Sequence, residues 1–415
     1  MLSYVIGIDI GSATCSVAIL HPDKRPVGKA TTFTNDAPGF ATLAAKLSQL
    51  PVPADHILIG MEATGIYWEN LYSFLQPHGY HLQLLHPGQT HHFAEQRGLR
   101  AKTDRVDAMT IARLLLSDEV RPAYVPGEQI ASYRELVRMM SSLTQEAARY
   151  NVEIQGLLTV LFPEFTQVFA DPCRPTARAL LSRYPSAQAF LDAGLAAVTT
   201  SLQEIAPKRY GERTAQRLLT LAAQTVASGV ARKARERSLE IRCAQLGHTQ
   251  EHLAGLEAEI ATLLQTDGGA AGLQSVPEFG PRTAAVLRAE LGDVARFSRS
   301  DQAVAYVGLD IRVRESGKWR GQRKVSKRGS GRVRRALYLA AVHSLTLPDS
   351  AFAAYYRHLV GQGVSKMSAL MAVMRKMLTV AYRLLKNGGR YDATKVWAAP
   401  QPPPATTLKE APAAA

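Results

Sequence analysis

The first 125 residues alternate between apolar, β-branched segments and amphipathic helical segments, and this alternation constrains the fold more than any other feature. Helical spacing of apolar residues marks FATLAAKLSQL and WENLYSFLQ, which separate the later strand segments. Strands interleaved with helices form a sheet with helices packed on it. The pattern predicts an α/β domain over residues 1–125, with five strands in a mixed sheet: YVIGIDIG, CSVAIL, KATTF, HILIGME and HLQLLHP.

The sequence pattern becomes helical after this domain. Apolar residues recur at helical spacing from about 128 to 160 and again from about 229 to 265. In the second segment they repeat every seven positions, at Leu239, Leu246, Leu253 and Ile260, although Arg242 and Thr249 interrupt the companion positions. We predict an antiparallel coiled coil over 126–265 with a helical insert at about 162–228. The alternative is one amphipathic helix packed on a core.

The C-terminal part divides into a basic segment and a tail. Residues 266–392 are mostly helical in pattern and are assigned to a third domain. Residues 393–415 are rich in Pro and Ala and are predicted to be disordered. The expected fold class is therefore α/β plus α.

The charge balance suggests a polyanionic partner. The 415 residues carry a formal net charge of +14, and the sequence pI is about 9.7. Nucleic acid is the simplest partner, because no basic amphipathic helix with an aromatic face suggests a membrane surface. The three cysteines show neither metal-ligand nor disulfide spacing, and no signal peptide or spanning segment is evident. We expect a soluble cytoplasmic protein, associated with the bacterial nucleoid when it is bound to DNA.

Four carboxylates stand at positions that can converge. Asp9 and Glu62 end predicted strands, and Asp104 and Asp107 begin a predicted helix after Thr103. A carboxylate cluster repels itself unless a cation fills it, and hard oxygen ligands suit Mg²⁺ or Mn²⁺. Two such ions about 4 Å apart can activate a nucleophile and stabilise a leaving oxygen at a phosphodiester.

Each carboxylate also has a simpler interpretation. Acids in the first turn of a helix favour its dipole, and Thr103 is a good N-cap. Glu62 can be an ordinary charge at a strand end. Asp9 in GIDIGS also resembles the first phosphate loop of actin-like ATPases and sugar kinases, although no second glycine-rich phosphate loop or adenosine pocket is evident.

A dense cationic stretch lies in the C-terminal segment. Between Ser316 and Ser344 the sequence contains no acid. Gly and Ser interruptions suggest a loop that exposes backbone donors, followed by a helix from Val333, so a phosphate-binding surface is favoured over a solvated face. The predicted nucleic-acid-binding residues are Arg100, Lys102, Lys318, Arg320, Arg323, Lys324, Lys327, Arg328, Arg332, Arg334 and Arg335.

Two further segments contain candidate sites. SVPEFGPRTAAVLRAELGD resembles a helix-hairpin-helix, in which a glycine-rich turn binds a DNA phosphate, but Glu278 replaces the first glycine of the turn. A purely structural hairpin is an equal alternative. HPGQTHH contains His86, His91 and His92, which are interpreted as surface or packing residues and are given no role.

Several motifs in a fixed order resemble one known family. GIDIGS, MEATGIY, LRAKTDRVDA, SVPEFGPRTAA, AYVGLDIRVRESG and SKRGSGRVRRALYLAA together resemble the DEDD transposases of the IS110 insertion-sequence family, also known as bridge-RNA-guided recombinases. The resemblance covers most of the chain, except the insert and the tail. It implies a RuvC-like nuclease fold with a ribonuclease H core for residues 1–125.

The resemblance also implies the catalytic residues and the partners. Asp9, Glu62, Asp104 and Asp107 would be catalytic metal ligands, and Ser316 would be the nucleophile that becomes linked to DNA. The sequence alone would not select this serine. The active site would join two domains from different protomers, and dimers would assemble into a tetramer. A structured bridge RNA would pair with donor and target DNA.

Three other functions remain open. A metal-dependent Holliday-junction nuclease would use water and no serine. A non-catalytic nucleic-acid-binding protein would not need the four carboxylates. An actin-like ATPase would hydrolyse nucleotide.

Overall fold

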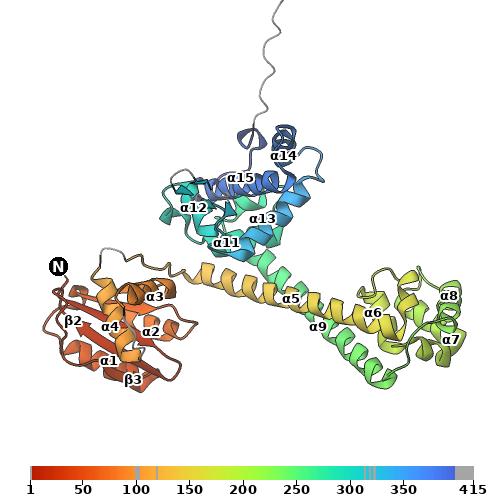
Figure 1. Ribbon diagram of the computed structural model, residues 1–415, viewed down its shortest axis with the longest axis horizontal. Helices are drawn as coiled ribbons and strands as arrows, with labels where there is room; N and C mark the ends of the chain where they lie inside the picture. Colours follow the sequence, from red (N-terminus) through yellow and green to blue (C-terminus); the bar gives the residue numbers. More distant parts are fainter. Residues whose placement is uncertain are drawn as a thin grey trace, which may run out of the picture. The chain divides into compact units, whose positions relative to one another are not determined.

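The computed structural model describes residues 2–98, 103–117, 120–312, 315–316, 319–320 and 324–397. The chain divides into two compact units, Met1–Val125 and Pro126–Ala415. Figure 1 labels the helices and strands of both units. In the described residues no helix is long and apolar enough to cross a membrane.

The first unit is built on a five-stranded mixed sheet. Its spatial order is β3-β2-β1-β4-β5. Strand β2 is antiparallel to both β1 and β3, whereas β4 is parallel to β1 and β5 is parallel to β4. All five predicted strands are confirmed. They are β1 (Tyr4–Ile10), β2 (Thr14–Leu20), β3 (Thr31–Thr34), β4 (Ile57–Glu62) and β5 (His81–Leu85).

Helices cover both faces of this sheet (Figure 1). On one face, even-numbered β1 residues such as Ile6 and Ile8 pack with α1 (Ala37–Ser48) and α2 (Trp68–Leu75). On the other, Val5 packs with α3 (Pro87–Gln96) and α4 (Asp104–Leu115). Successive side chains of a strand point to opposite faces of the sheet, so the odd-numbered residues of β1 lie on the face that α4 covers.

Two long helices organise the second unit. They are α5 (Glu128–Leu161) and α9 (Arg232–Thr266), which pack against each other. The start of α5 shares a core with the end of α9, and the end of α5 shares a core with the start of α9, so the pair is antiparallel. Arg242, which interrupts the seven-residue repeat, forms an ion pair with Glu153 of α5 at 2.6 Å. A charged residue therefore fits at this position because the facing helix supplies its partner.

The segment between these two helices is helical, as expected, and packs around a core that it shares with the end of α5 and the start of α9. Its helices are α6 (Pro175–Arg183), α7 (Ala187–Ile205) and α8 (Glu212–Ala223). Buried aromatic rings from the 162–169 stretch, with Phe190 of α7, fill the space between them. The insert is thus a folded helical body of the second unit.

The C-terminal segment packs around the start of α5 and the end of α9. Tyr133 and Val137 of α5 and Ile260 of α9 belong to the same core as its helices. The helices are α10 (Ala271–Gln274), α11 (Pro281–Leu291), α12 (Ser300–Val307), α13 (Gly331–Ser344), α14 (Ala351–Gly361) and α15 (Lys366–Asn387). The basic stretch contains two small ladders: β6 (Ile311–Arg312) pairs with β9 (Lys324–Val325), and β7 (Glu315–Ser316) pairs with β8 (Trp319–Arg320). The sequence predicts a loop in this stretch. The structure corrects this prediction, because parts of the stretch form antiparallel strand pairs.

The sequence predicts disorder from residue 393, but residues 393–397 have a defined structure that begins with the 3-10 helix Ala393–Lys395. Val396 is buried, and the Trp397 ring lies 5.2 Å from that of His358. These two apolar side chains precede the Pro/Ala-rich composition and can therefore join the core. Residues 398–415 lie outside the described residues.

Candidate active site

Two glycines bring the helix α4 against the sheet. Gly7 of β1 and Gly60 of β4 are register partners in the parallel pair. A Cβ atom on Gly7 would lie 2.1 Å from the backbone oxygen of Ala108, and one on Gly60 would lie 2.4 Å from Leu115 Cδ1. Only glycine permits such a close approach of the helix backbone to β1.

The same spacing aims two carboxylates at the start of that helix. Asp9 and Glu62 each follow a glycine by two residues, so both share the face that α4 covers. Ile8 pairs with Met61, which places the next residues of both strands at one end of the sheet. The glycine-x-acid pattern of GID and GME thus encodes close packing and site geometry together.

Glu62 is held by two threonines that the sequence does not single out. The Thr64 hydroxyl donates to Glu62 Oε1 at 2.7 Å, and the Thr90 hydroxyl donates a short hydrogen bond to Glu62 Oε2. Thr90 is buried in α3 and its hydroxyl also lies 2.8 Å from the Pro87 carbonyl oxygen. In HPGQTHH the residue that contacts the candidate site is therefore Thr90 and not a histidine. The only sequence signal for it is its position in the first turn of a helix that begins with a proline.

Asp104 and Asp107 lie in the first turn of α4. Thr103 is the N-cap, and its side-chain oxygen accepts from the Val106 N–H at 3.4 Å. Asp104 is exposed, and Asp107 is half-buried. The cap predicted from sequence is present, so the acids also have the favourable dipole position of the simpler interpretation.

The electrostatics of Asp9 reveal that the four carboxylates converge. Burial is the largest cause that raises the pKa of Asp9 from 3.8 to about 6. The negative charges of Asp107, Asp104 and Glu62 raise the pKa further, in that order. Carboxylates affect one another in this way only when they lie near one another, so the structure brings all four predicted residues into one neighbourhood.

The donor set fits a hard divalent cation. Four carboxylates supply the oxygen ligands that Mg²⁺ and Mn²⁺ prefer, and a cation would relieve the repulsion felt by Asp9. Among the described residues, the only three metal-binding side chains with ligand atoms all within 4.8 Å of one another are His91, His92 and Glu95. All three are exposed on α3. The four carboxylates are thus neighbours without forming a closed ligand cage.

Ser316 lies in the second unit, at the end of β7, where it pairs with Trp319 of β8. Two other predicted residues, Arg320 and Lys324, lie in β8 and β9. Arg100, Lys102, Lys318 and Arg323 lie outside the described residues.

The lysines and arginines of the basic stretch that the structure describes fall into two groups. Lys327, Arg328 and Arg335 are exposed. The half-buried Arg334 instead donates through Nη1 to the carbonyl oxygens of Val307 at 2.9 Å and Gly329 at 3.0 Å. Arg332 forms an ion pair with Glu290 at 3.4 Å. The sequence pattern does not distinguish these arginines, whereas the tertiary structure engages two of them internally.

Tight packing shapes the chain just before α13. A Cβ atom on Gly329 would lie 2.1 Å from the Tyr306 carbonyl oxygen, and Lys327 adopts a positive φ of 55°. The Lys327 N–H donates to the Gly308 carbonyl oxygen at 3.1 Å. This backbone is fixed against α12, so Lys327 and Arg328 project from a defined turn.

Glu278 of the hairpin faces inward. It is buried, and its Oε1 accepts from the Ser350 hydroxyl at 2.5 Å. Ser350 also caps α14, because its oxygen accepts from the Ala353 N–H at 3.2 Å. The carboxylate therefore joins the segment before α11 to the start of α14, a role that a glycine at this position could not fulfil.

Comparisons with known proteins agree with this architecture. A family described as "Transposase", the DEDD transposases of the IS110 type, matches residues 6–163, which contain all four carboxylates. A second family, "Transposase IS116/IS110/IS902 family", matches residues 270–357, which contain Ser316 and most of the basic stretch.

Relatives that align with about three quarters or more of the chain support the same assignment. The chain is 29% identical over 320 residues to the insertion element IS110 uncharacterized 43.6 kDa protein of Streptomyces coelicolor, covering 74% of each chain. It is 23% identical over 391 residues to the pilin gene-inverting protein of Moraxella bovis, covering 93% of this chain and 97% of the relative. The insertion element IS900 uncharacterized 42 kDa protein of Mycobacterium paratuberculosis is 26% identical over 324 residues, covering 75% of this chain and 79% of the relative.

These matches and the two units define the chain as a transposase of the insertion-sequence class. It belongs to the IS116/IS110/IS902 family of transposases.

Proposed function

We propose that the chain cuts and rejoins DNA through a serine–phosphate intermediate. In this proposal Asp9, Glu62, Asp104 and Asp107 hold Mg²⁺, or Mn²⁺, beside the scissile phosphate. The observation that carries it is the close packing of α4 against β1 and β4, with Asp9 and Glu62 on the sheet face that α4 covers and Asp104 and Asp107 in the first turn of α4. The charges of these three neighbouring acids also raise the pKa of Asp9. When bound, the cation supplies Lewis-acid stabilisation of charge at the phosphate oxygens.

Ser316 is the proposed nucleophile. Its hydroxyl oxygen attacks the phosphorus of a DNA strand, a serine–phosphate ester forms, and the bond to the leaving deoxyribose oxygen breaks. The serine proton passes to solvent, and solvent protonates the leaving oxygen. Rejoining reverses this step with a different strand end. The exposed Lys327, Arg328 and Arg335 would hold the nucleic-acid backbone during both steps.

Further parts of the proposal concern assembly and fold. We infer a RuvC-like fold for the sheet unit, a coiled coil for α5 and α9, and a helix-hairpin-helix-like turn around Glu278. We also propose domain boundaries at about residues 125 and 265. The active site would join two protomers of a tetramer, and a bridge RNA would select donor and target DNA by pairing.

Inversion by one relative supports a recombinase. The pilin gene-inverting protein of Moraxella bovis is named for inverting DNA, and its match spans 93% of this chain. Inversion needs strands to be cut and rejoined, so a covalent intermediate that stores the phosphodiester energy suits this reaction. A water-using nuclease would lose that energy at each cut.

The test is a search for the covalent adduct. Labelled DNA that carries the gene's flanking sequence, a transcript of the adjacent non-coding segment, protein and Mg²⁺ are incubated and run on a denaturing gel with and without protease. The wild type should give a protease-sensitive shifted band, and Ser316→Ala should give neither adduct nor cleavage while it still binds DNA. Normal cleavage by Ser316→Ala would promote the water-using nuclease.

The carboxylates are tested in the same assay. Asp107→Asn keeps side-chain size and leaves the Thr103 cap of α4 intact. It should reduce strand cleavage at least about a hundredfold and change the melting temperature little, because it removes a proposed metal ligand and no packing. Parallel losses of activity and stability would instead support a helix-terminal role for this acid.

A further inference from the structure

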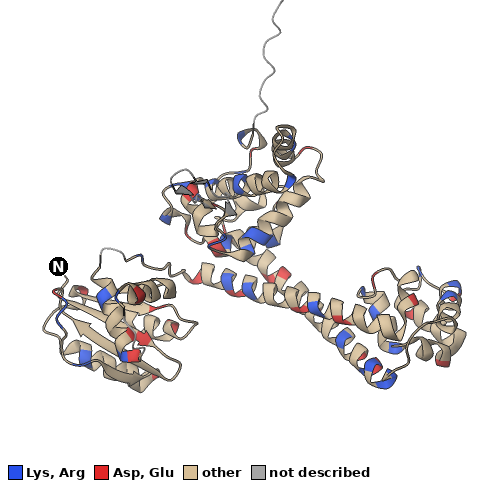
Figure 2. Ribbon diagram, viewed as in Figure 1, with Lys and Arg blue, Asp and Glu red and all other residues tan. Residues whose placement is uncertain are grey.

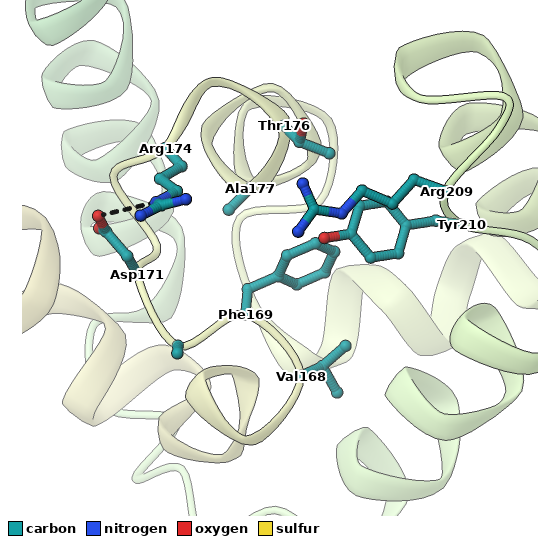
Figure 3. Close-up of a pocket in the computed structure, with 9 residues that line it drawn as sticks. Val168, Phe169, Asp171, Arg174, Thr176, Ala177, Arg209 and Tyr210 are labelled. Atoms are coloured by element: carbon teal, nitrogen blue, oxygen red, sulfur yellow. Dashed lines mark ion pairs between the residues drawn. The ribbon is translucent and has the colours of Figure 1, made fainter.

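The helical insert contains a cavity of about 350 Å³. This is within the range of small-ligand pockets, about 300–1,000 Å³. Its walls include Phe169, Asp171, Arg174, Thr176, Arg209 and Tyr210. Figure 3 shows Asp171 and Arg174 on one side of the cavity and Arg209 with Tyr210 on the other.

One side of the cavity is aromatic. The rings of Phe169 and Tyr210 have centroids 5.2 Å apart at an angle of 59°. Phe169 is buried and therefore fixed, while Tyr210 is half-buried. The Arg209 guanidinium lies over the Tyr210 ring, 5.5 Å from its centroid. Aromatic rings and guanidinium planes are the surfaces on which unpaired nucleobases stack.

The other side of the cavity suits a phosphate. Arg174 and Asp171 form an ion pair at 3.6 Å, and both side chains are largely exposed. An exposed pair of this kind contributes little energy, so the guanidinium can turn to a stronger anion at small cost. Arg209, on the aromatic side, is also exposed and adds a second positive charge to the cavity.

The backbone of α6 adds donors to the same side. Thr176 and Ala177 line the cavity and lie in the first turn of α6, after Pro175. First-turn N–H groups lack partners within their own helix, and the N-cap residue Arg174 has no side-chain acceptor to offer them. These groups favour an anion near Arg174.

We propose that this cavity binds one unpaired nucleotide of a nucleic acid. Its base would stack beside Tyr210 and Arg209, and its phosphate would lie between Arg174 and the first turn of α6. The site lies in the stretch between residues 163 and 270, which neither matched transposase family includes. It would give this protein a nucleic-acid contact in the insert that does not depend on the carboxylate site.

Photocrosslinking tests the location. Single-stranded RNA and DNA oligonucleotides that contain 5-iodouracil are bound to the full chain and irradiated, and the crosslinked peptides are identified by mass spectrometry. Crosslinks should map to Tyr210 or Phe169, and a duplex of the same sequence should give far fewer. The yields of the RNA and DNA probes identify the natural source. Crosslinks confined to other regions would overturn the proposal.

Matched variants test the chemistry. Arg209→Gln and Tyr210→Leu should each weaken oligonucleotide binding about tenfold and remove the crosslink. Arg213→Gln makes the same charge change at an exposed residue of α8 outside this cavity, and should leave both intact. Equal losses for Arg209→Gln and Arg213→Gln would show only general electrostatic attraction and would overturn the proposal.

Two controls separate the cavity from the protein core and from the carboxylate site. Arg209 is exposed, so Arg209→Gln tests the cavity without a change in the core, whatever the folding of Tyr210→Leu. Asp107→Asn should retain the crosslink at Tyr210, because that residue lies in the other unit. Failure of the proposed cleavage mechanism would therefore not affect this result.

Discussion

The carboxylate end of the sheet and the basic stretch around α13 are both dense in charge, but the structure uses their charges differently. At the sheet, four acids from three elements come together, and the pKa of Asp9 rises to about 6. In the basic stretch, Arg332 has an acidic partner and Arg334 is bonded to backbone carbonyls, while Lys327, Arg328 and Arg335 remain exposed. Figure 2 shows basic residues distributed over α5, α9 and the C-terminal helices.

The difference teaches how to interpret charge in a sequence. Like charges that converge raise the free energy of the folded state, so they persist when function requires them. Charges along one surface segment repel each other less, and some can be recruited to hold the fold. The acids at the sheet are therefore the stronger indication of a site, and the basic stretch must be divided residue by residue.

The largest expected effect breaks the close packing that creates the acidic site. Gly7→Ala places a Cβ atom 2.1 Å from the Ala108 oxygen, and backbone atoms cannot move aside as a flexible side chain would. We expect a loss of about 3 kcal/mol in the free energy of unfolding of the sheet unit, measured by urea denaturation.

The matched control is in the other unit. Gly156→Ala adds a methyl group on exposed α5 with no heavy atom within 4 Å, so stability should rise by about 0.5–1 kcal/mol. If Gly7→Ala did not lower the free energy of unfolding, α4 would not be packed against β1 as closely as the structure places it.

A smaller effect separates neighbouring arginines in the basic stretch. Arg334→Ala removes two hydrogen bonds to carbonyl oxygens and should lower the free energy of unfolding by about 2 kcal/mol. Arg335→Ala should leave stability within about 0.5 kcal/mol, because Arg335 is exposed. It should instead reduce the slope of log affinity against log salt for duplex DNA by about 0.9 if it contacts one phosphate. The opposite assignment of the two effects would contradict this division of the arginines.

The smallest effect is the pH dependence that Asp9 causes in metal-free protein. Its pKa is about 6 in the folded state and near 3.9 in an unfolded chain. Between these values the folded protein holds a proton that the unfolded chain has released, so stability falls as the pH rises from about 4 to 6. Asp9 is only half-buried, so solvent screening reduces this contribution to roughly 1 kcal/mol.

Urea denaturation in EDTA at both ends of this pH range measures the effect. Asp9→Asn should remove that part of the fall, and Mg²⁺ should stabilise the wild type more than the variant at neutral pH. Identical pH profiles for the two proteins would show that the folded protein does not raise the pKa of Asp9.

Much of the fold followed from local patterns. The five strands, the cap at Thr103 and the two long helices could be predicted, because each depends on residues close together in sequence. Asp9, Glu62, Asp104 and Asp107 could be selected as candidates since they end strands or begin a helix. Ser316 was different, because only its family resemblance, and no property of the residue, distinguished it.

The sequence by itself determined which segments become strands and helices, and where acidic and basic residues stand along them. Only the tertiary structure decided which of these residues meet. It placed Thr90 on Glu62, turned Glu278 toward Ser350, engaged Arg334 with Val307, and formed the cavity beside Tyr210. The physical reason is range. Backbone preference and hydrophobic periodicity act over a few residues, whereas these three side-chain contacts join positions that are 27 to 72 residues apart in sequence and close only when the core packs.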